Sequence, residues 1–298
     1  MAGLSGKSAA VIGLGALGSV TAELLAKSVG TIVLIDHDIV EQSNLERQPF
    51  YDKGNVNKLK CEVVYEKLMK RYSKIIIVSR AVHIDQQTIK EVNADIILDC
   101  TDNFETRFVI NDYCKKNNIP WVHAAAAGSI GVVVPFTGNY CFGCIYGNKK
   151  KGLTCDDSGI MIEVARKTAQ IQVDEALKIL NGKPCTQGMI RFVGGVIDTL
   201  AIKDGCNCMG RKENNVQFTL SKCTTRAGYS AKPSKNMKLN LSRIKEKFTT
   251  LIETPIVLVI KENDIEIVVH EYGELLFKSG TDEELMNKIA KKVYSFKL

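Results

Sequence analysis

Three glycines near the start of the chain could hold a phosphate group. Gly13, Gly15 and Gly18 lie between a strongly apolar run and a segment with helical character. Glycines at this place permit a tight turn and let the free amides of a helix N-terminus approach a phosphate. Asp36 follows the next apolar run, 18 residues after Gly18, where a carboxylate can accept hydrogen bonds from ribose hydroxyls. This pattern alone predicts a nucleotide-binding turn, which NAD-dependent oxidoreductases also use.

The residues that follow Asp36 favour ATP chemistry over hydride transfer. A dense polar segment spans residues 37–48, and its side chains suited to contact a nucleotide are Asp38, Asn44, Arg47 and Gln48. Arg47 and Lys60 can neutralise the β- and γ-phosphates of ATP. A carboxylate such as Asp102, after a later apolar run, can hold a magnesium ion.

Four of the ten cysteines form two close pairs, Cys141 with Cys144 and Cys206 with Cys208. In a reducing cytosol, such pairs are typical of a structural zinc site with four thiolate ligands. The ion would tie the loop after the sheet to a later hairpin, and four thiolates would leave it no open position for chemistry. Four reduced thiols without a metal, or a redox pair, are the alternatives.

Alternating apolar and amphipathic runs predict the elements that position these residues. The predicted strands are 8–14, 31–36, 75–78, 94–99 and 120–125, and the predicted helices are 16–29, 57–72, 86–92 and 103–117. Strands this apolar, separated by helices, predict a Rossmann-like α/β fold with a doubly wound, mostly parallel sheet.

A second pattern begins near residue 126. The first domain, residues 1–211, is expected to end with a strand within 126–138, a polar loop over 137–160, a helix over 160–181 and two short strands joined at Gly194 and Gly195. Residues 212–298 are rich in lysine and carry no motif. Strands over 256–260 and 265–270 and a helix over 281–294 predict a small α+β domain there.

The composition excludes several classes of protein. The 298 residues are 45% hydrophobic and 24% charged, as in soluble globular proteins. No apolar run approaches about 18 residues, so we expect no membrane span. The chain opens without a cleavage-site pattern, which predicts a cytoplasmic protein. The net charge is +7, and the lysine-rich stretches of the sequence contain no interleaved aromatic residues. This pattern favours a solvated surface over nucleic-acid binding.

One series of motifs resembles a known enzyme family. DxDxVExSNLxRQ from Asp36, a helix with Lys60 and DCTDNxxTR from Asp99 together resemble the MoeB/ThiF-type adenylyltransferases, relatives of the ubiquitin-activating enzymes. The resemblance covers residues 8–211. It implies use of ATP, Mg²⁺ and Zn²⁺, a homodimer, and an acyl-adenylate formed on a ubiquitin-fold protein that ends in Gly-Gly. That partner would be a sulfur carrier, as in thiamine or molybdopterin biosynthesis or tRNA thiolation, or a conjugated modifier.

The resemblance also implies roles for individual residues. Asp36 would hold the ribose, Asp102 would bind magnesium, and the side chains contacting the triphosphate would be Asn44, Arg47 and Lys60. The other nucleotide-binding residues would be Gly13, Gly15, Gly18, Asp38, Gln48 and Asn103. Lys60 is preferred to Lys58 because VNKLK then aligns with the family's VGxPK, in which Asn57 replaces a glycine.

Cys155 resembles the loop cysteine that some relatives use to receive an activated acyl group or persulfide sulfur. A downstream sulfur donor or conjugation enzyme would then be a further partner. The negative charges of Asp156 and Asp157 disfavour a thiolate, so a bystander thiol is the alternative. Family members also carry an arginine before the first strand that reaches the partner subunit's ATP. None of the seven residues before Ser8 is arginine, so the source of that contact stays open.

Two other functions remain open from the sequence. One is ATP-dependent activation of a different substrate, such as a peptide carboxylate or a tRNA base. The other is an NAD-binding Rossmann-fold module without adenylation.

Overall fold

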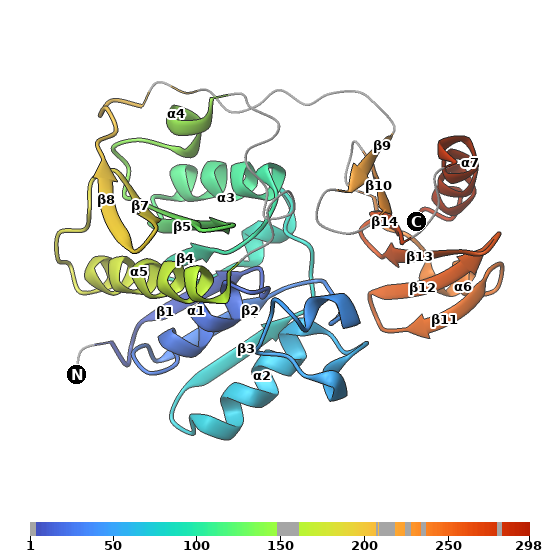
Figure 1. The fold of residues 1–298 in the computed structure, drawn as a ribbon, viewed down its shortest axis with the longest axis horizontal. Helices are drawn as coiled ribbons and strands as arrows, with labels where there is room; N and C mark the ends of the chain where they lie inside the picture. The colour runs from blue at the N-terminus through green and yellow to red at the C-terminus, as the bar shows by residue number, and fades with distance from the viewer. Residues whose placement is uncertain are drawn as a thin grey trace. The chain divides into compact units, whose positions relative to one another are not determined.

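The chain divides into two compact units, Met1–Gly210 and Arg211–Leu298. Each unit has its own sheet in the computed structural model (Figure 1). The structure describes residues 4–147, 161–206, 208, 218–223, 228–233, 237–278 and 282–298. Within these ranges, no helix combines the length and the apolar character needed to cross a membrane.

The first unit is built on an eight-stranded sheet in the order β3-β2-β1-β4-β5-β6-β7-β8. Its strands are β1 (Ser8–Ile12), β2 (Thr31–Ile35), β3 (Ile76–Arg80), β4 (Ile96–Asp99), β5 (Trp121–Ala127), β6 (Ile130–Phe136), β7 (Met189–Val193) and β8 (Val196–Leu200). The strands from β3 to β5 in this order pair in parallel, and β5 to β8 pair antiparallel. The predicted mostly parallel α/β sheet is therefore confirmed. The strand order reverses between β1 and β4, and ligands of such sheets bind at the carboxyl ends of the strands at this point.

Helices cover both faces of this sheet (Figure 1). The helices of the first unit are α1 (Gly18–Leu25), α2 (Lys60–Arg71), α3 (Phe104–Asn117), α4 (Phe142–Tyr146) and α5 (Ile162–Leu180). On one face, α1 contacts α5 through a hydrogen bond from Thr21 Oγ1 to Gln172 Oε1, 3.0 Å long. On the other face, α3 and α4 pack with the sheet around a common aromatic core.

Stacked and edge-on rings form that aromatic core. Trp121 stacks on Phe136 with ring centroids 4.4 Å apart, and Phe142 of α4 meets Phe108 of α3 edge-on at 5.0 Å. Trp121, the single tryptophan of the sequence, is buried. Large rings buried this way contribute much of the apolar area that stabilises a domain. The core therefore holds α3 and α4 against the strands that end at the candidate site.

The structure corrects several predicted boundaries. The first strand ends at Ile12 because the chain turns at Gly13, and the helix predicted for 57–72 begins only at Lys60. The helix predicted for 86–92 is a short 3-10 helix, η3 (Thr88–Glu91). The loop predicted for 137–160 contains α4, a helix of one turn that the polar sequence around CFGC does not indicate.

The second unit is a six-stranded antiparallel sheet in the order β11-β12-β13-β14-β10-β9, and its described residues also form two helices. Its elements are β9 (Phe218–Cys223), β10 (Gly228–Pro233), α6 (Leu241–Lys245), β11 (Thr249–Glu253), β12 (Val257–Glu262), β13 (Ile265–His270), β14 (Leu275–Phe277) and α7 (Glu283–Tyr294). The two predicted strands are present, joined by a turn in which Asn263 and Asp264 have φ of 48° and 62°. Four further strands were not predicted from the sequence. The unit has an apolar core of its own.

Candidate functional site

The glycine turn between β1 and α1 is too tightly packed to accept side chains at two of its three glycines. Gly13 has a φ of +86°, and a Cβ there would lie 2.8 Å from the carbonyl oxygen of Cys100. A Cβ on Gly18 would lie 1.8 Å from the carbonyl oxygen of Gly13. Beside Gly15, by contrast, the nearest atom to a Cβ would be Gln48 Nε2 at 3.7 Å. The turn therefore packs against the end of β4 on one side and leaves room at Gly15 on the other.

The N-terminus of α1 suits an anion. Leu17 is the N-cap residue, no side chain caps the helix, and its first turn carries no acidic residue. The first amides of an uncapped helix lack intrahelical partners and carry partial positive charge. Together with the space at Gly15, this geometry fits a phosphate group.

Asp36 joins the glycine turn to the polar segment that follows β2. Its Oδ2 accepts a hydrogen bond from the Leu14 N–H at 2.6 Å, and its Oδ1 accepts one from the Asp38 N–H at 2.8 Å. The Tyr51 hydroxyl donates to the Leu14 carbonyl oxygen from the other side. Burial, with the negative charge of Asp36 adding to it, raises the pKa of Tyr51 well above its ordinary value. Tyr51 is therefore a neutral donor that supports the turn.

A short antiparallel contact brings Lys60 to this segment. The Val40 N–H donates to the Lys58 carbonyl oxygen at 2.8 Å, and the Lys60 N–H donates to the Asp38 carbonyl oxygen at 2.9 Å. Asn57 makes the turn with a φ of 69°, a conformation that asparagine adopts more readily than most residues. Asn57 thus fills the place of the family's glycine without losing the turn.

The side chains of Lys60, which is buried, and Asp38, which is partly buried, form an ion pair. Lys60 Nζ lies 3.0 Å from Asp38 Oδ2, and Lys60 is only 5% exposed. Lys58, two residues earlier, is exposed. Lys60, the lysine preferred from the sequence, is therefore the one that Asp38 and Asp36 link to the glycine turn.

Asn44, Arg47 and Gln48 lie on one turn at the 3-10 helix η1 (Gln42–Asn44). The Arg47 and Gln48 N–H groups both donate to the Asn44 carbonyl oxygen, at 3.1 and 2.8 Å. Asn44 Oδ1 accepts from the Glu41 N–H at 3.2 Å, so this buried side chain also shapes the turn itself. Gln48 is buried beside Gly15.

Asp102 and Asn103 follow β4 and have different surroundings. Asp102 is exposed, and its Oδ1 lies 3.5 Å from Asn103 Nδ2. Asn103 caps α3 by accepting a hydrogen bond from the Thr106 N–H at 2.8 Å. An exposed carboxylate two residues beyond Cys100, on which Gly13 packs, is a suitable oxygen ligand for magnesium.

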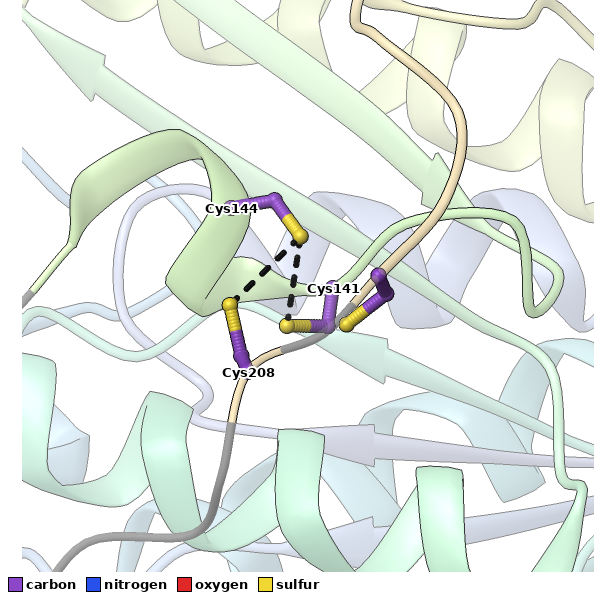
Figure 2. A group of neighbouring side chains, drawn as sticks. Cys141, Cys144 and Cys208 are labelled. Atoms are coloured by element: carbon purple, nitrogen blue, oxygen red, sulfur yellow. Dashed lines mark hydrogen bonds between the residues drawn. The ribbon is translucent and has the colours of Figure 1, made fainter.

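The four paired cysteines come together in one cluster. One sulfur atom from each of Cys141, Cys144, Cys206 and Cys208 lies within 4.8 Å of the others. Figure 2 shows the thiols of Cys141, Cys144 and Cys208 turned toward one another, with Sγ–Sγ distances of 3.7 Å from Cys144 to each of the other two. Four thiolates around a tetrahedral zinc ion at a Zn–S distance of about 2.3 Å stand about 3.8 Å apart. The four thiols therefore suit a zinc ion, and the two shortest Sγ–Sγ distances match those of a tetrahedral site.

Lys115 of α3 reaches the same cluster. Its Nζ lies 3.2 Å from Cys206 Sγ and 3.1 Å from the carbonyl oxygen of Cys208. Burial opposes ionisation of Cys206, but hydrogen bonds from the Cys208 backbone, Cys141 and Lys115 outweigh it and lower its pKa to about 6. A positive charge here offsets the negative charge of a four-thiolate centre.

Comparison with known proteins identifies the family. The model of the ThiF family matches residues 1–204 of the chain. The chain belongs to the ThiF family. It is 28% identical over 298 residues to the sulfur carrier protein ThiS adenylyltransferase of Bacillus subtilis, covering 92% of this chain and 88% of that protein. It is 31% identical over 193 residues to the molybdopterin-synthase adenylyltransferase of Escherichia coli, covering 61% of this chain and 77% of that protein.

A solved structure shares the fold over most of this chain's length. The crystal structure of Escherichia coli MccB with ATP has a TM-score of 0.61 and 24% sequence identity, over 70% of this chain and 67% of that one. At this level of identity the likeness concerns the fold. The resemblance that the motif series indicated is confirmed.

Within this ThiF-family site, one group of buried polar residues was not singled out from the sequence. Asp99, the last residue of β4, is fully buried, and its Oδ2 lies 2.6 Å from His123 Nδ1 and 3.6 Å from Arg107 Nε. The sequence does show a signal for Asp99, because an acidic residue that closes an apolar strand at the sheet's carboxyl edge is a candidate for a buried partner. The scattered position of His123 gave no such signal.

These buried groups have a defined charge. Burial lowers the pKa of His123 despite the hydrogen bond to Asp99, so the imidazole is neutral and donates through Nδ1. Burial alone would raise the pKa of Asp99, but the hydrogen bond from His123 and the charge of Arg107 outweigh it and hold that pKa below its ordinary value. The group therefore contains one carboxylate and one guanidinium, with no net charge.

The predicted site residues thus fall into three groups. In the first group, contacts link the glycine turn to Asp36, Asp38, Lys60 and Gln48. Asn44 and Arg47 belong to the same backbone turn as Gln48. Asp102 follows the end of β4, on which Gly13 and Gly18 pack. The four paired cysteines form the separate cluster. Cys155 lies outside the residues that the structure describes.

Proposed function

We propose that this chain uses ATP to adenylate the C-terminal glycine carboxylate of a small ubiquitin-fold protein. The support is its membership of the ThiF family and its similarity, along most of its length, to a protein named ThiS adenylyltransferase. Relatives named as adenylyltransferase and sulfurtransferase, such as MOCS3 of Xenopus laevis at 32% identity over 189 residues, fit the same chemistry. The product is a mixed anhydride of the carboxylate and AMP, with pyrophosphate released.

The chemistry asks for positioning and charge compensation. A carboxylate oxygen attacks the α-phosphorus, an O–P bond forms, and the bond from that phosphorus to the pyrophosphate oxygen breaks. The carboxylate is already ionised near pH 7, so no general base is required. Arg47 and Lys60 would compensate charge on the departing pyrophosphate, and Asp36 would hold the ribose. Asp102, with its exposed carboxylate, would hold Mg²⁺, which supplies further charge neutralisation when bound.

The observation that carries this proposal is the contact network around the glycine turn. Asp36 binds the backbone of both the turn and Asp38, and Asp38 pairs with Lys60. Binding of NAD does not require a buried lysine at this place, whereas binding of a triphosphate requires positive charge to compensate its negative charge. The network therefore favours ATP over NAD as the ligand.

Other parts of the chain take supporting roles in this proposal. Residues 1–211 form the adenylation domain, in which zinc on the cysteine cluster stabilises the fold, and 212–298 form an additional domain. A homodimer is expected from the family. Cys155 would act in one of two ways: its thiolate attacks the acyl-adenylate carbonyl, releasing AMP and forming a thioester, or it attacks the outer sulfur of a persulfide on a donor protein, releasing the donor's thiol and forming a Cys155 persulfide. A Cys155→Ala chain that still carries the acyl group or sulfur would contradict that role for Cys155.

The test is ATP–pyrophosphate exchange with ubiquitin-fold proteins that end in Gly-Gly. We expect exchange that requires Mg²⁺ and an intact Gly-Gly terminus. Lys60→Met should slow it about 100-fold, because a group that stabilises developing charge is lost. Lys58→Met is the matched control and should leave the rate unchanged, and thermal melting of both variants separates catalysis from folding. Stabilisation of the chain by NAD but not by MgATP, with no exchange, would refute the proposal.

A further inference from the structure

Two buried side chains hold Thr101, the residue before Asp102. Asp99 Oδ1 accepts hydrogen bonds from the Thr101 N–H at 3.0 Å and from the Thr101 hydroxyl at 2.6 Å. Arg107 Nη2 donates to the Thr101 carbonyl oxygen at 2.5 Å. The N–H, the hydroxyl and the carbonyl oxygen of Thr101 are thereby all held by the buried side chains of Asp99 and Arg107. Because Asp102 comes next in the chain, these contacts determine where its carboxylate leaves the loop.

The same loop is fixed from the opposite face of the sheet. Gln172 of α5 donates from Nε2 to the carbonyl oxygens of Asp99 and Val122, both at 2.9 Å. The Cys100 N–H donates to the Ile12 carbonyl oxygen at 2.8 Å. Residues 99–101 are therefore held by α3, α5, β1 and β5, and Asp102 is the first exposed residue after them.

His123 has one polar partner in this arrangement. Its Nδ1 bonds to Asp99, whereas its Nε2 is buried and, among the described residues, has no hydrogen-bond partner. The imidazole is surrounded by the rings of Trp121, Phe142 and Tyr146, at centroid distances of 6.3, 5.3 and 6.0 Å. Burying a half-satisfied imidazole and a carboxylate costs free energy that an apolar pair would not. The contact between His123 and Asp99 therefore orients the Asp99 carboxylate more than it stabilises the fold.

We propose that Asp99, His123 and Arg107 form a positioning array that fixes the Asp102 carboxylate for metal–nucleotide binding. His123 orients the Asp99 carboxylate, Asp99 and Arg107 hold Thr101, and Thr101 sets the direction of Asp102. This inference rests on the proposed function, because it takes Asp102 as the ligand of Mg²⁺ that accompanies ATP. Groups that orient a metal ligand in this way commonly change metal affinity about ten- to hundredfold when they are removed.

The test compares two substitutions at one position. His123→Asn keeps a donor near the place of Nδ1, whereas His123→Leu fills the space without a donor. Calorimetric titration with MgATP and with metal-free ATP is made on both variants and on the unchanged chain. We expect His123→Leu to weaken MgATP binding about tenfold, with little effect on metal-free ATP, and His123→Asn to restore most of the affinity. Thr101→Val, a half-buried position, should reproduce the loss if His123→Leu does not fold.

A second readout needs no nucleotide. The amide hydrogens of Cys100 and Thr101 should exchange slowly with solvent in the unchanged chain and in His123→Asn, and faster in His123→Leu. Unchanged MgATP affinity in His123→Leu and Thr101→Val, or equal losses with and without Mg²⁺, would overturn the positioning array. If the unchanged chain binds no MgATP, the proposed function fails instead, and exchange at these amides still shows whether the array orders the loop.

Discussion

Glycine at three neighbouring positions serves two different purposes in this chain. Gly13 and Gly18 are required because other backbone atoms occupy the space of a side chain, with Gly18 facing the carbonyl oxygen of Gly13. Gly15 has room beside it, bounded by the side-chain amide of Gln48. In a nucleotide site that room belongs to the phosphates, whose approach the second glycine of such a turn permits.

This difference predicts opposite outcomes for two alanine substitutions. Gly18→Ala should destabilise the first unit by about 1–3 kcal/mol or more, because backbone must shift to admit the methyl group. Gly15→Ala should melt at nearly the same temperature as the unchanged chain but bind MgATP more weakly. Thermal melting and calorimetric titration measure the two effects. Equal stability of both variants, or full MgATP affinity in Gly15→Ala, would contradict this division of roles.

At the residue scale, the sequence identified candidate site residues where their neighbours in the chain form a recognisable motif. The segment from Asp36 to Gln48 and the helix start at Lys60 carry recognisable side chains next to strand ends, so they could be placed at the site in advance. His123 could not, because its partner Asp99 is on another strand and only the sheet pairing of β4 with β5 brings them together. The separation of Asp99 and His123 along the sequence does not indicate that they are in contact.

Elements whose formation depends on tertiary contacts were the ones missed. The five-residue helix α4 has no side-chain cap, but the Phe142 N–H donates to the buried Asn111 side chain of α3 at 2.8 Å, and the Phe142 ring packs into the core. The strands β9, β10, β11 and β14 have mixed polarity or are short, so periodicity alone does not reveal them. The apolar strands β12 and β13 were predicted because their burial is visible in the sequence.

The cysteine cluster predicts that a metal stabilises α4 and the segment that carries Cys206 and Cys208. We expect about one zinc ion per chain, as measured by elemental analysis. Cys144→Ser should lose the metal and melt at a lower temperature, since a structural site contributes directly to folding. Cys185→Ser, at a half-buried thiol outside the cluster, is the matched control and should retain zinc. A chain that is fully folded and active with no metal after chelation would refute the structural role.

At the scale of the whole molecule, the candidate nucleotide-binding residues and the cysteine cluster belong to the same unit, Met1–Gly210. α3 is the physical link, since its first residues follow Asp102 and its later residue Lys115 contacts the cluster. The unit Arg211–Leu298 has a separate core and contributes none of the residues to which we assign a role in adenylation. We therefore place the proposed reaction in the first unit.

The most direct test of that reaction is intact mass spectrometry of the substrate. A ubiquitin-fold protein ending in Gly-Gly is incubated with the full chain and MgATP, without any acceptor thiol. We expect a mass increase of one adenylyl group on that protein, lost when its last glycine is removed and greatly reduced with Lys60→Met. An unmodified partner across the ubiquitin-fold proteins tested, with a chain that is folded and binds MgATP, would contradict adenylation of such a terminus.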